Sequence, residues 1–251
     1  MEKIYIFDVD GTLTPSRLQM TEKFKNFFEE WVKRNNFYLV TGSDLPKLQE
    51  QMNSMEIHSS GIFTCCGNQF WQSDPAVHPK HCDLIYDNKF ELTDKLKTML
   101  NVVLMASPYP DRYGNHIEDR GSMVNFSIVG RDCNQMQREI FFEWDNKNGE
   151  RKKIATAIKE KFPELDAVLG GQISIDIYPK GMDKSQVLSH IRDDNIVSSM
   201  DEYIFIGDRT DKSGNDYPLA KLMNETDNCS YYQTEGWEKT IKILKELELN
   251  G

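Results

Sequence analysis

Two aspartates and a glycine follow a short apolar run near the N-terminus, in the order Asp8-Val9-Asp10-Gly11-Thr12. The apolar run Ile4 to Phe7 is typical of a buried strand, so both carboxylates are expected at a strand end. Carboxylates two residues apart leave an extended chain on one face, and such a pair suits a hard divalent cation such as Mg²⁺. The cation would reduce the repulsion between an attacking carboxylate and a phosphate. The segment therefore predicts a magnesium and phosphate site.

The sequence disfavours two other kinds of metal site. A calcium-binding loop also begins Asp-x-Asp, but here its sixth position is Leu13 in place of glycine and its twelfth is Gln19 in place of glutamate. Zinc is disfavoured because the second group of ligand-type residues has no Cys-x-x-Cys pair. The role of that group stays unassigned; its members are Cys65, Cys66, His78, His81 and Cys82.

A second apolar strand, Tyr203 to Gly207, delivers another carboxylate, Asp208. The carboxyl ends of parallel strands meet at one edge of a sheet, so Asp208 is expected beside the first pair. Lys184, which begins the helix before this strand, would place an ammonium at the same edge, suited to a phosphate or to Asp8. Ser43 follows the predicted strand 37–41 and is expected there too.

The elements around these residues alternate between strand and helix, which is typical of a parallel α/β sheet. The pattern predicts a helix over 20–35, a strand over 37–41, a helix over 45–52 and a strand over 61–65. Between residues 83 and 181 it changes to an antiparallel α+β character, and then the parallel pattern resumes. We therefore expect an α/β core from 1–82 and 182–251, with 83–181 forming an inserted α+β cap.

Composition limits the possible partners. The chain has 251 residues and a formal net charge of −10, which argues against nucleic acid or an anionic membrane as a principal partner. No apolar run is long enough to span a membrane, and no signal peptide precedes the first strand. The five cysteines are odd in number and scattered, which indicates free thiols in a reducing compartment. A cytoplasmic protein is expected.

The motifs together resemble those of the haloacid dehalogenase (HAD) superfamily of phosphotransferases. Asp8 and Asp10 correspond to the first motif, Ser43 to the second, Lys184 to the third, and Asp208 with Asp216 to the fourth. The segments 42–51 and 170–176 extend the resemblance to the eukaryotic-type phosphomannomutases, over nearly the whole chain. The resemblance implies a HAD-like Rossmannoid core with an inserted cap. It also implies an isomerase of mannose metabolism that interconverts mannose 6-phosphate and mannose 1-phosphate through a hexose 1,6-bisphosphate.

The resemblance also implies roles for individual residues. Asp8 would carry the phosphoryl group as an aspartyl phosphate, Asp10 would transfer protons, and Ser43 and Lys184 would hold the transferring phosphate. The metal residues are Asp8, Asp10 through its backbone carbonyl, Asp208, Asn215 and Asp216. The substrate residues are Arg17, Arg120, Arg131, Arg138, Ser174 and Asp176. Guanidinium groups bind phosphate bidentately, which supports the arginines independently. Arg138 could instead pair with an acidic neighbour on its helix, and Asp176 could be such an arginine's partner.

The resemblance further implies Mg²⁺ as cofactor, a hexose 1,6-bisphosphate as activator, sugar phosphates as ligands, a role in GDP-mannose synthesis, and a homodimer formed through the cap. The catalytic residues alone also allow a sugar-phosphate phosphatase, in which water takes the phosphoryl group. A noncatalytic phosphosugar-binding protein is a third hypothesis, disfavoured because it would not need both Asp8 and Asp10.

Overall fold

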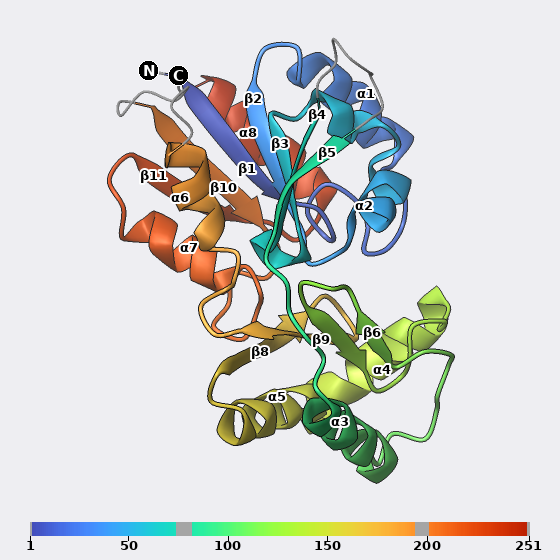
Figure 1. Cartoon of the computed structure of the whole chain (residues 1–251). Coiled ribbons are helices and arrows are strands. Elements are labelled where there is room, and N and C mark those ends of the chain that lie inside the picture. The colour runs from blue at the N-terminus through green and yellow to red at the C-terminus, as the bar shows by residue number, and fades with distance from the viewer. Residues whose placement is uncertain (1, 74–81, 194–200, 250–251) are drawn as a thin grey trace.

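The computed structural model describes residues 2–73, 82–193 and 201–249, so His78 and His81 lie outside the described residues. The strands form two separate sheets, one of seven strands and one of four. In Figure 1 the larger sheet occupies the half that holds both termini, and the smaller sheet occupies the other half. None of the helices in the described ranges combines the length and the apolar character that a membrane span requires.

The seven-stranded sheet supports the catalytic edge. Its first five strands in spatial order run parallel, and the last two join them antiparallel. The order is β11 (Cys229–Gln233), β10 (Glu202–Gly207), β1 (Lys3–Asp8), β2 (Asn36–Val40), β3 (Gly61–Thr64), β4 (Gln69–Ser73) and β5 (Cys82–Asp87). The carboxyl ends of the parallel strands point toward the smaller sheet (Figure 1).

Strand β1 is buried on both faces because its side chains alternate between two apolar clusters. Tyr5 and Phe7 pack on one face of the sheet, and Ile4 and Ile6 pack on the other. The helices of the first face are α1 (Glu22–Trp31), α2 (Leu45–Met52) and α8 (Trp237–Leu249), and those of the second are α6 (Gln186–Asp193) and α7 (Tyr217–Asn224). Burial on both faces is the usual state of a parallel sheet, and it makes β1 a rigid base for the aspartates at its end.

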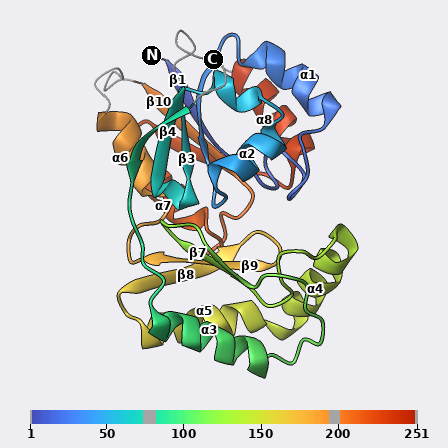
Figure 2. The same ribbon diagram turned by 45° about the vertical axis from the view of Figure 1, so that its right-hand side comes forward.

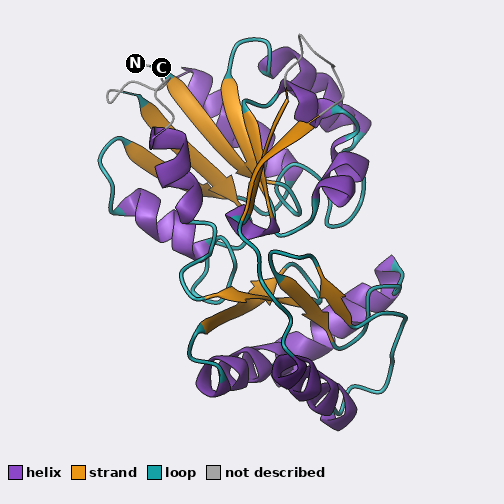
Figure 3. Cartoon of the chain, viewed as in Figure 1, coloured by secondary structure: helices purple, strands orange, loops and turns teal. Residues whose placement is uncertain are grey.

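The smaller sheet is antiparallel throughout. Its spatial order is β6 (Ile117–Asp119), β7 (Val124–Ser127), β9 (Ser174–Pro179) and β8 (Leu165–Gly170). The helices α3 (Asp94–Ala106), α4 (Gln135–Asn148) and α5 (Glu150–Lys161) pack against its apolar face. Figures 2 and 3 show the sheet lying between the core and the helices α3 and α5. The polar face is therefore turned toward the core.

The predicted fold class is confirmed, with local corrections. The helix predicted over 45–52 is α2, and Thr21 caps α1 by accepting a hydrogen bond from the Phe24 amide. The predicted boundary between residues 82 and 83 falls inside β5, because this strand pairs with β4 in the large sheet. Cys65 does not continue β3; residues Cys65–Gly67 form a 3₁₀ turn in which both cysteines have positive φ.

Candidate active site

Asp8 ends β1 and is buried where the parallel strands finish. One carboxylate oxygen accepts a hydrogen bond from Lys184 Nζ at 2.6 Å, and the other accepts one from Thr12 Oγ1 at 3.1 Å. Lys184 is fully buried and also donates to Asp216 Oδ1 at 2.7 Å. A single ammonium thus connects the end of β1 to the loop that follows β10.

Three carboxylates gather around this ammonium. Asp8, Asp208 and Asp216 each have an oxygen within 4.8 Å of the other two. When all are ionised, their three negative charges and the positive charge of Lys184 sum to −2, the charge that a divalent cation balances. An all-carboxylate donor set is also the chemistry that Mg²⁺ prefers. The residues therefore fit the predicted metal.

The electrostatics of the cluster point the same way. Burial raises the pKa of Asp8 to about 7, and repulsion from Asp216 adds to the effect while Lys184 opposes it. Burial also raises the pKa of Asp208 well above its ordinary value, with further contributions from Asp8 and Asp216. Buried like charges disfavour ionisation until a cation compensates them. A cation bound here would hold these carboxylates in the ionised form that a nucleophile needs.

Gly11 makes the close approach of Asp208 possible. Its φ is +83°, and a Cβ atom at this position would lie 2.5 Å from Asp208 Oδ2. Any side chain would therefore be strained in backbone and would also collide with the carboxylate. The glycine of the first motif is thus required by the metal cluster as well as by the turn.

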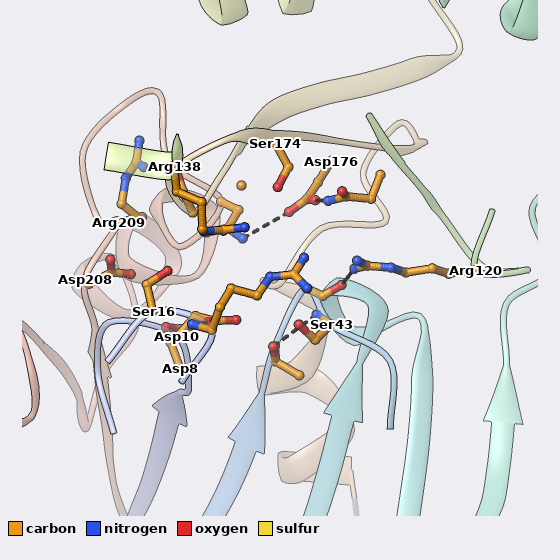
Figure 4. A pocket seen from close by; sticks show the side chains of 17 residues that line it. Asp8, Asp10, Ser16, Ser43, Arg120, Arg138, Ser174, Asp176, Asp208 and Arg209 are labelled. Atoms are coloured by element: carbon orange, nitrogen blue, oxygen red, sulfur yellow. Dashed lines mark hydrogen bonds between the residues drawn. The ribbon is translucent and has the colours of Figure 1, made fainter. Parts of the chain in front are cut away.

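Asp10 lies in a different environment from Asp8. Its Oδ1 accepts the backbone N–H of Arg17 at 2.7 Å and the side-chain N–H of Gln51 at 2.9 Å. Within the described residues its carboxylate is not part of the acidic cluster. Figure 4 shows both aspartates at the floor of one cavity. The two aspartates therefore have separate partners, which suits two separate chemical tasks.

Ser43 lies in the turn between β2 and α2 and is buried. Its backbone N–H donates to Thr41 Oγ1 at 3.0 Å, and the next residue, Asp44, caps α2 by accepting the Lys47 amide. The N-terminal end of a helix favours an anion through its dipole and its free N–H groups. Ser43 is therefore placed where a phosphate would be stabilised.

The cap contributes Ser174 and Asp176 from the polar face of β9. Asp176 accepts Asn125 Nδ2 at 2.6 Å within the cap and Asn215 Nδ2 at 3.2 Å from the core. Asn215, expected as a metal residue, thus directs its amide nitrogen at the cap. Asp176 is not paired with one of the predicted arginines; instead it connects the two halves of the molecule across the cavity (Figure 4).

Two of the predicted arginines share one acidic partner. Arg120 donates to Glu118 and to the backbone carbonyl of Gly42, so its guanidinium already links cap and core. Arg131 donates to Ser174 Oγ at 3.2 Å and lies 3.4 Å from Glu118. Nη2 is the atom that faces Glu118, and Nε is buried without a hydrogen-bond partner in the described part of the chain. Arg131 is therefore only partly engaged, whereas Arg120 is largely engaged.

Arg138 is the least paired of the cap arginines. Nη1 has only the Cys133 sulfur at 4.0 Å, and Nε is buried without a partner among the described residues. Burial lowers the pKa of Arg138, and the nearby positive charge of Arg17 lowers it further. No acidic neighbour on its own helix pairs with it in the described ranges, contrary to the alternative above. A buried guanidinium in this state is suited to an anion.

Core and cap enclose the site together. The cavity has a volume of about 40 Å³ and is lined from the core by residues that include Asp8, Asp10, Ser43 and Arg17, and from the cap by residues that include Arg120, Arg138, Ser174 and Asp176. On its rim, Arg209 donates to the Gly171 carbonyl at 2.7 Å, and outside the cavity Leu169 donates its amide to the Ser213 carbonyl. Together with the bonds of Arg120 to Gly42 and of Asp176 to Asn215, these contacts hold the cap against the core.

The structure brings most of the predicted residues to this cavity and adds others. Lys184 and Asp216 lie buried beneath it, and Arg131 bonds its wall through Ser174. The residues at the site that were not predicted include Gln51, Glu118 and Asn125. Gln51 had a detectable signal, because it falls on the apolar face of α2 with Leu48 and Met52. A polar residue on such a face needs a buried partner.

The comparisons with known proteins agree with one another. The family model described as eukaryotic phosphomannomutase matches residues 24–249. The chain belongs to this family. A phosphomannomutase of Encephalitozoon cuniculi is 34% identical, with 99% of this chain and 96% of the relative covered. A probable phosphomannomutase of Caenorhabditis elegans is 33% identical, covering 98% and 96%. A phosphomannomutase of Arabidopsis thaliana is 34% identical, with 86% of this chain and 86% of the relative covered.

Solved structures share the fold at lower identity. The IMP-bound IMP-nucleotidase of Plasmodium falciparum superposes with a TM-score of 0.65 at 17% identity, covering 98% of this chain and 68% of the nucleotidase. A haloacid dehalogenase-like hydrolase from Bacteroides thetaiotaomicron gives a TM-score of 0.60 at 14% identity, covering 97% and 100%. These likenesses support the HAD-like core with a cap, and they carry no information on substrate.

Proposed function

We propose that the protein is a phosphomannomutase that interconverts mannose 6-phosphate and mannose 1-phosphate and so supplies GDP-mannose synthesis. The observation that carries this proposal is a cavity with anion-binding groups on two opposite walls. The core wall has Asp8 and Ser43, with the Lys184 ammonium buried beneath Asp8. The cap wall has Arg138, whose buried Nε has no hydrogen-bond partner among the described residues, and Arg131 lies behind that wall, bonded to Ser174. A phosphatase needs one phosphate site, whereas a hexose bisphosphate has two phosphates to bind.

In the proposed reaction Asp8 forms a bond to phosphorus while the bond from phosphorus to the sugar oxygen breaks. Asp10 donates a proton to the departing oxygen and later removes one from the hydroxyl that accepts the phosphoryl group. General acid and base catalysis of this kind contributes about 10²–10⁴ in rate. The separate hydrogen-bond partners of the two aspartates support this division of roles.

Asp8, Asp208 and Asp216 are the residues that would hold Mg²⁺. When bound, the ion would offset the repulsion between these carboxylates and the phosphate. Asp10 would add its backbone carbonyl, as the resemblance implies.

The bisphosphate must reverse its orientation between the two half-reactions, whereas hydrogen bonds between cap and core hold the two walls of the cavity together. The cap must therefore open for substrate entry and close for chemistry, which excludes water from the aspartyl phosphate. The cap contacts that would break on opening are those of Arg120 with Gly42, Asp176 with Asn215, and Arg209 with Gly171.

The test follows mannose 1-phosphate in the presence of Mg²⁺, with and without added glucose 1,6-bisphosphate, and measures isomerised sugar and free phosphate separately. We expect isomerisation to exceed phosphate release and to increase with the bisphosphate. Release of phosphate without isomerisation would identify a phosphatase. No turnover of either kind would support the noncatalytic binding protein.

We further propose a cytoplasmic homodimer formed through the cap. Exposed apolar side chains on cap helices support this, namely Val102 and Met105 on α3 and Met136 and Ile140 on α4. Light scattering should then report about twice the chain mass of 29.2 kDa. A monomer at all concentrations would refute the dimer without bearing on the activity.

A further inference from the structure

We propose that Gln51 is a positioning residue for Asp10, one that orients the carboxylate so that only Oδ2 carries the transferred proton. The inference rests on the proposed role of Asp10 as acid and base. Gln51 lies near the C-terminal end of α2, the helix that begins directly after Ser43 and Asp44. Figure 1 shows α2 at the end of the sheet that faces the cap.

Gln51 is held firmly in place. It is 1% exposed, and its backbone carbonyl accepts the Met20 amide at 2.7 Å. Its side-chain Nε2 donates to Asp10 Oδ1 at 2.9 Å and lies 3.4 Å from Thr14 Oγ1. The amide therefore touches both ends of the turn 10–14, with its shorter bond to the carboxylate.

The other end of the same amide has no such support. Gln51 Oε1 is buried and has no hydrogen-bond partner among the described residues. An unpaired buried acceptor is unfavourable, and an apolar side chain on this apolar face of α2 would avoid it. The contact with Asp10 is thus what a glutamine provides here and an apolar residue would not.

The geometry has a direct chemical consequence. Asp10 Oδ1 accepts two N–H groups, one from Gln51 and one from the Arg17 backbone. A proton on Oδ1 would point at these hydrogens, so the proton is directed to Oδ2. Without Gln51 only the Arg17 bond would remain, and the carboxyl group would be freer to rotate about its terminal torsion. Proton transfer depends on such alignment, whereas phosphate binding does not.

The test compares Gln51→Leu with Gln49→Leu, a matched control on the same helix. Gln51→Met serves as a second variant, because an unbranched side chain adapts to the buried space. Three quantities are measured: kcat and KM for isomerisation of mannose 1-phosphate, the burst of nitrophenolate when excess nitrophenyl phosphate meets concentrated enzyme, and the rate of phenol release from phenyl phosphate under the same conditions. Phenolate is the poorer leaving group and needs an acid, whereas nitrophenolate needs little help.

We expect Gln51→Leu and Gln51→Met to lower kcat for isomerisation and the phenyl phosphate rate by about ten- to a hundredfold, a part of the full effect of acid catalysis. KM and the nitrophenolate burst should change by less than about twofold, and Gln49→Leu should match the wild type. Equal losses on both aryl phosphates, no loss on either, or the same selective loss in Gln49→Leu would overturn the proposal.

The aryl phosphate pair keeps this test independent of the proposed function. If the wild-type protein fails to isomerise sugar phosphates, the mutase assignment is lost. The ratio of phenyl to nitrophenyl phosphate rates still decides whether Gln51 positions the acid.

Discussion

Replacing Arg138 by methionine should weaken binding of the sugar phosphate without lowering the stability of the free protein. Methionine keeps an unbranched stem of similar length and a good helix former in α4, but it removes the charge. Arg138 is buried beside Arg17, and its Nε has no partner in the described ranges. Its removal costs the 4.0 Å contact with the Cys133 sulfur, which keeps its hydrogen bond to the Gly130 carbonyl. The free protein should therefore be as stable as the wild type or slightly more stable.

The effect on the reaction should be large. A charge-assisted hydrogen bond contributes about 1.5–3 kcal/mol. At about 1.4 kcal/mol for each tenfold change, Arg138→Met should lower kcat/KM for mannose 1-phosphate by about ten- to a hundredfold for each bond lost. Nitrophenyl phosphate has no second anionic end, so its turnover should change by less than about threefold.

The assay combines isomerisation kinetics on both substrates with thermal unfolding. Arg120→Met is the matched comparison, since that guanidinium already bonds Glu118 and the Gly42 carbonyl. It should lower the melting temperature as well as the activity, because its removal leaves those groups unpaired. If Arg138→Met lowers the melting temperature and slows both substrates equally, Arg138 holds the cap together, and the argument for a second phosphate site fails.

Three further predictions concern the core. Asp8→Asn should leave the protein folded but reduce turnover below about a thousandth, because an amide is a poor nucleophile; a variant with more activity would refute the covalent mechanism. Asp10→Ala should abolish sugar phosphate isomerisation yet retain a burst with nitrophenyl phosphate, and equal losses on both substrates would indicate a structural role. The third follows from the pKa of Asp8, which is raised from 3.8 to about 7. Without Mg²⁺, Asp8 binds a proton more tightly in the folded protein than in the unfolded chain. Protonation of Asp8 therefore stabilises the folded protein at low pH, and this stabilisation is lost as the pH rises from about 4 to 7. Mg²⁺ should therefore raise the melting temperature more at pH 8 than at pH 5.5, and an equal or larger shift at pH 5.5 would contradict the assignment of the metal cluster.

Much of the catalytic edge could be predicted from local sequence. Apolar runs that end in Asp8 and Asp208 identify buried strands and their carboxyl ends, because alternation and strand length are properties of short segments. The antiparallel strands β4 and β8 were not predicted, since their pairing partners, and not their own residues, determine that they are strands. The same reason explains the misplaced boundary inside β5, which becomes a core strand only by pairing with β4.

The sequence by itself determined the chemical groups available and the strand ends and helices that carry them, because propensity and periodicity act over a few residues. Only the tertiary structure decided which groups became partners. It directed Asp8 toward Lys184, 176 positions away, and Asp10 toward Gln51, 41 positions away. It also engaged Arg120 while leaving donors of Arg138 unpaired. Such pairings depend on the packing of distant segments, and the chemistry of each side chain follows from the partner it meets there.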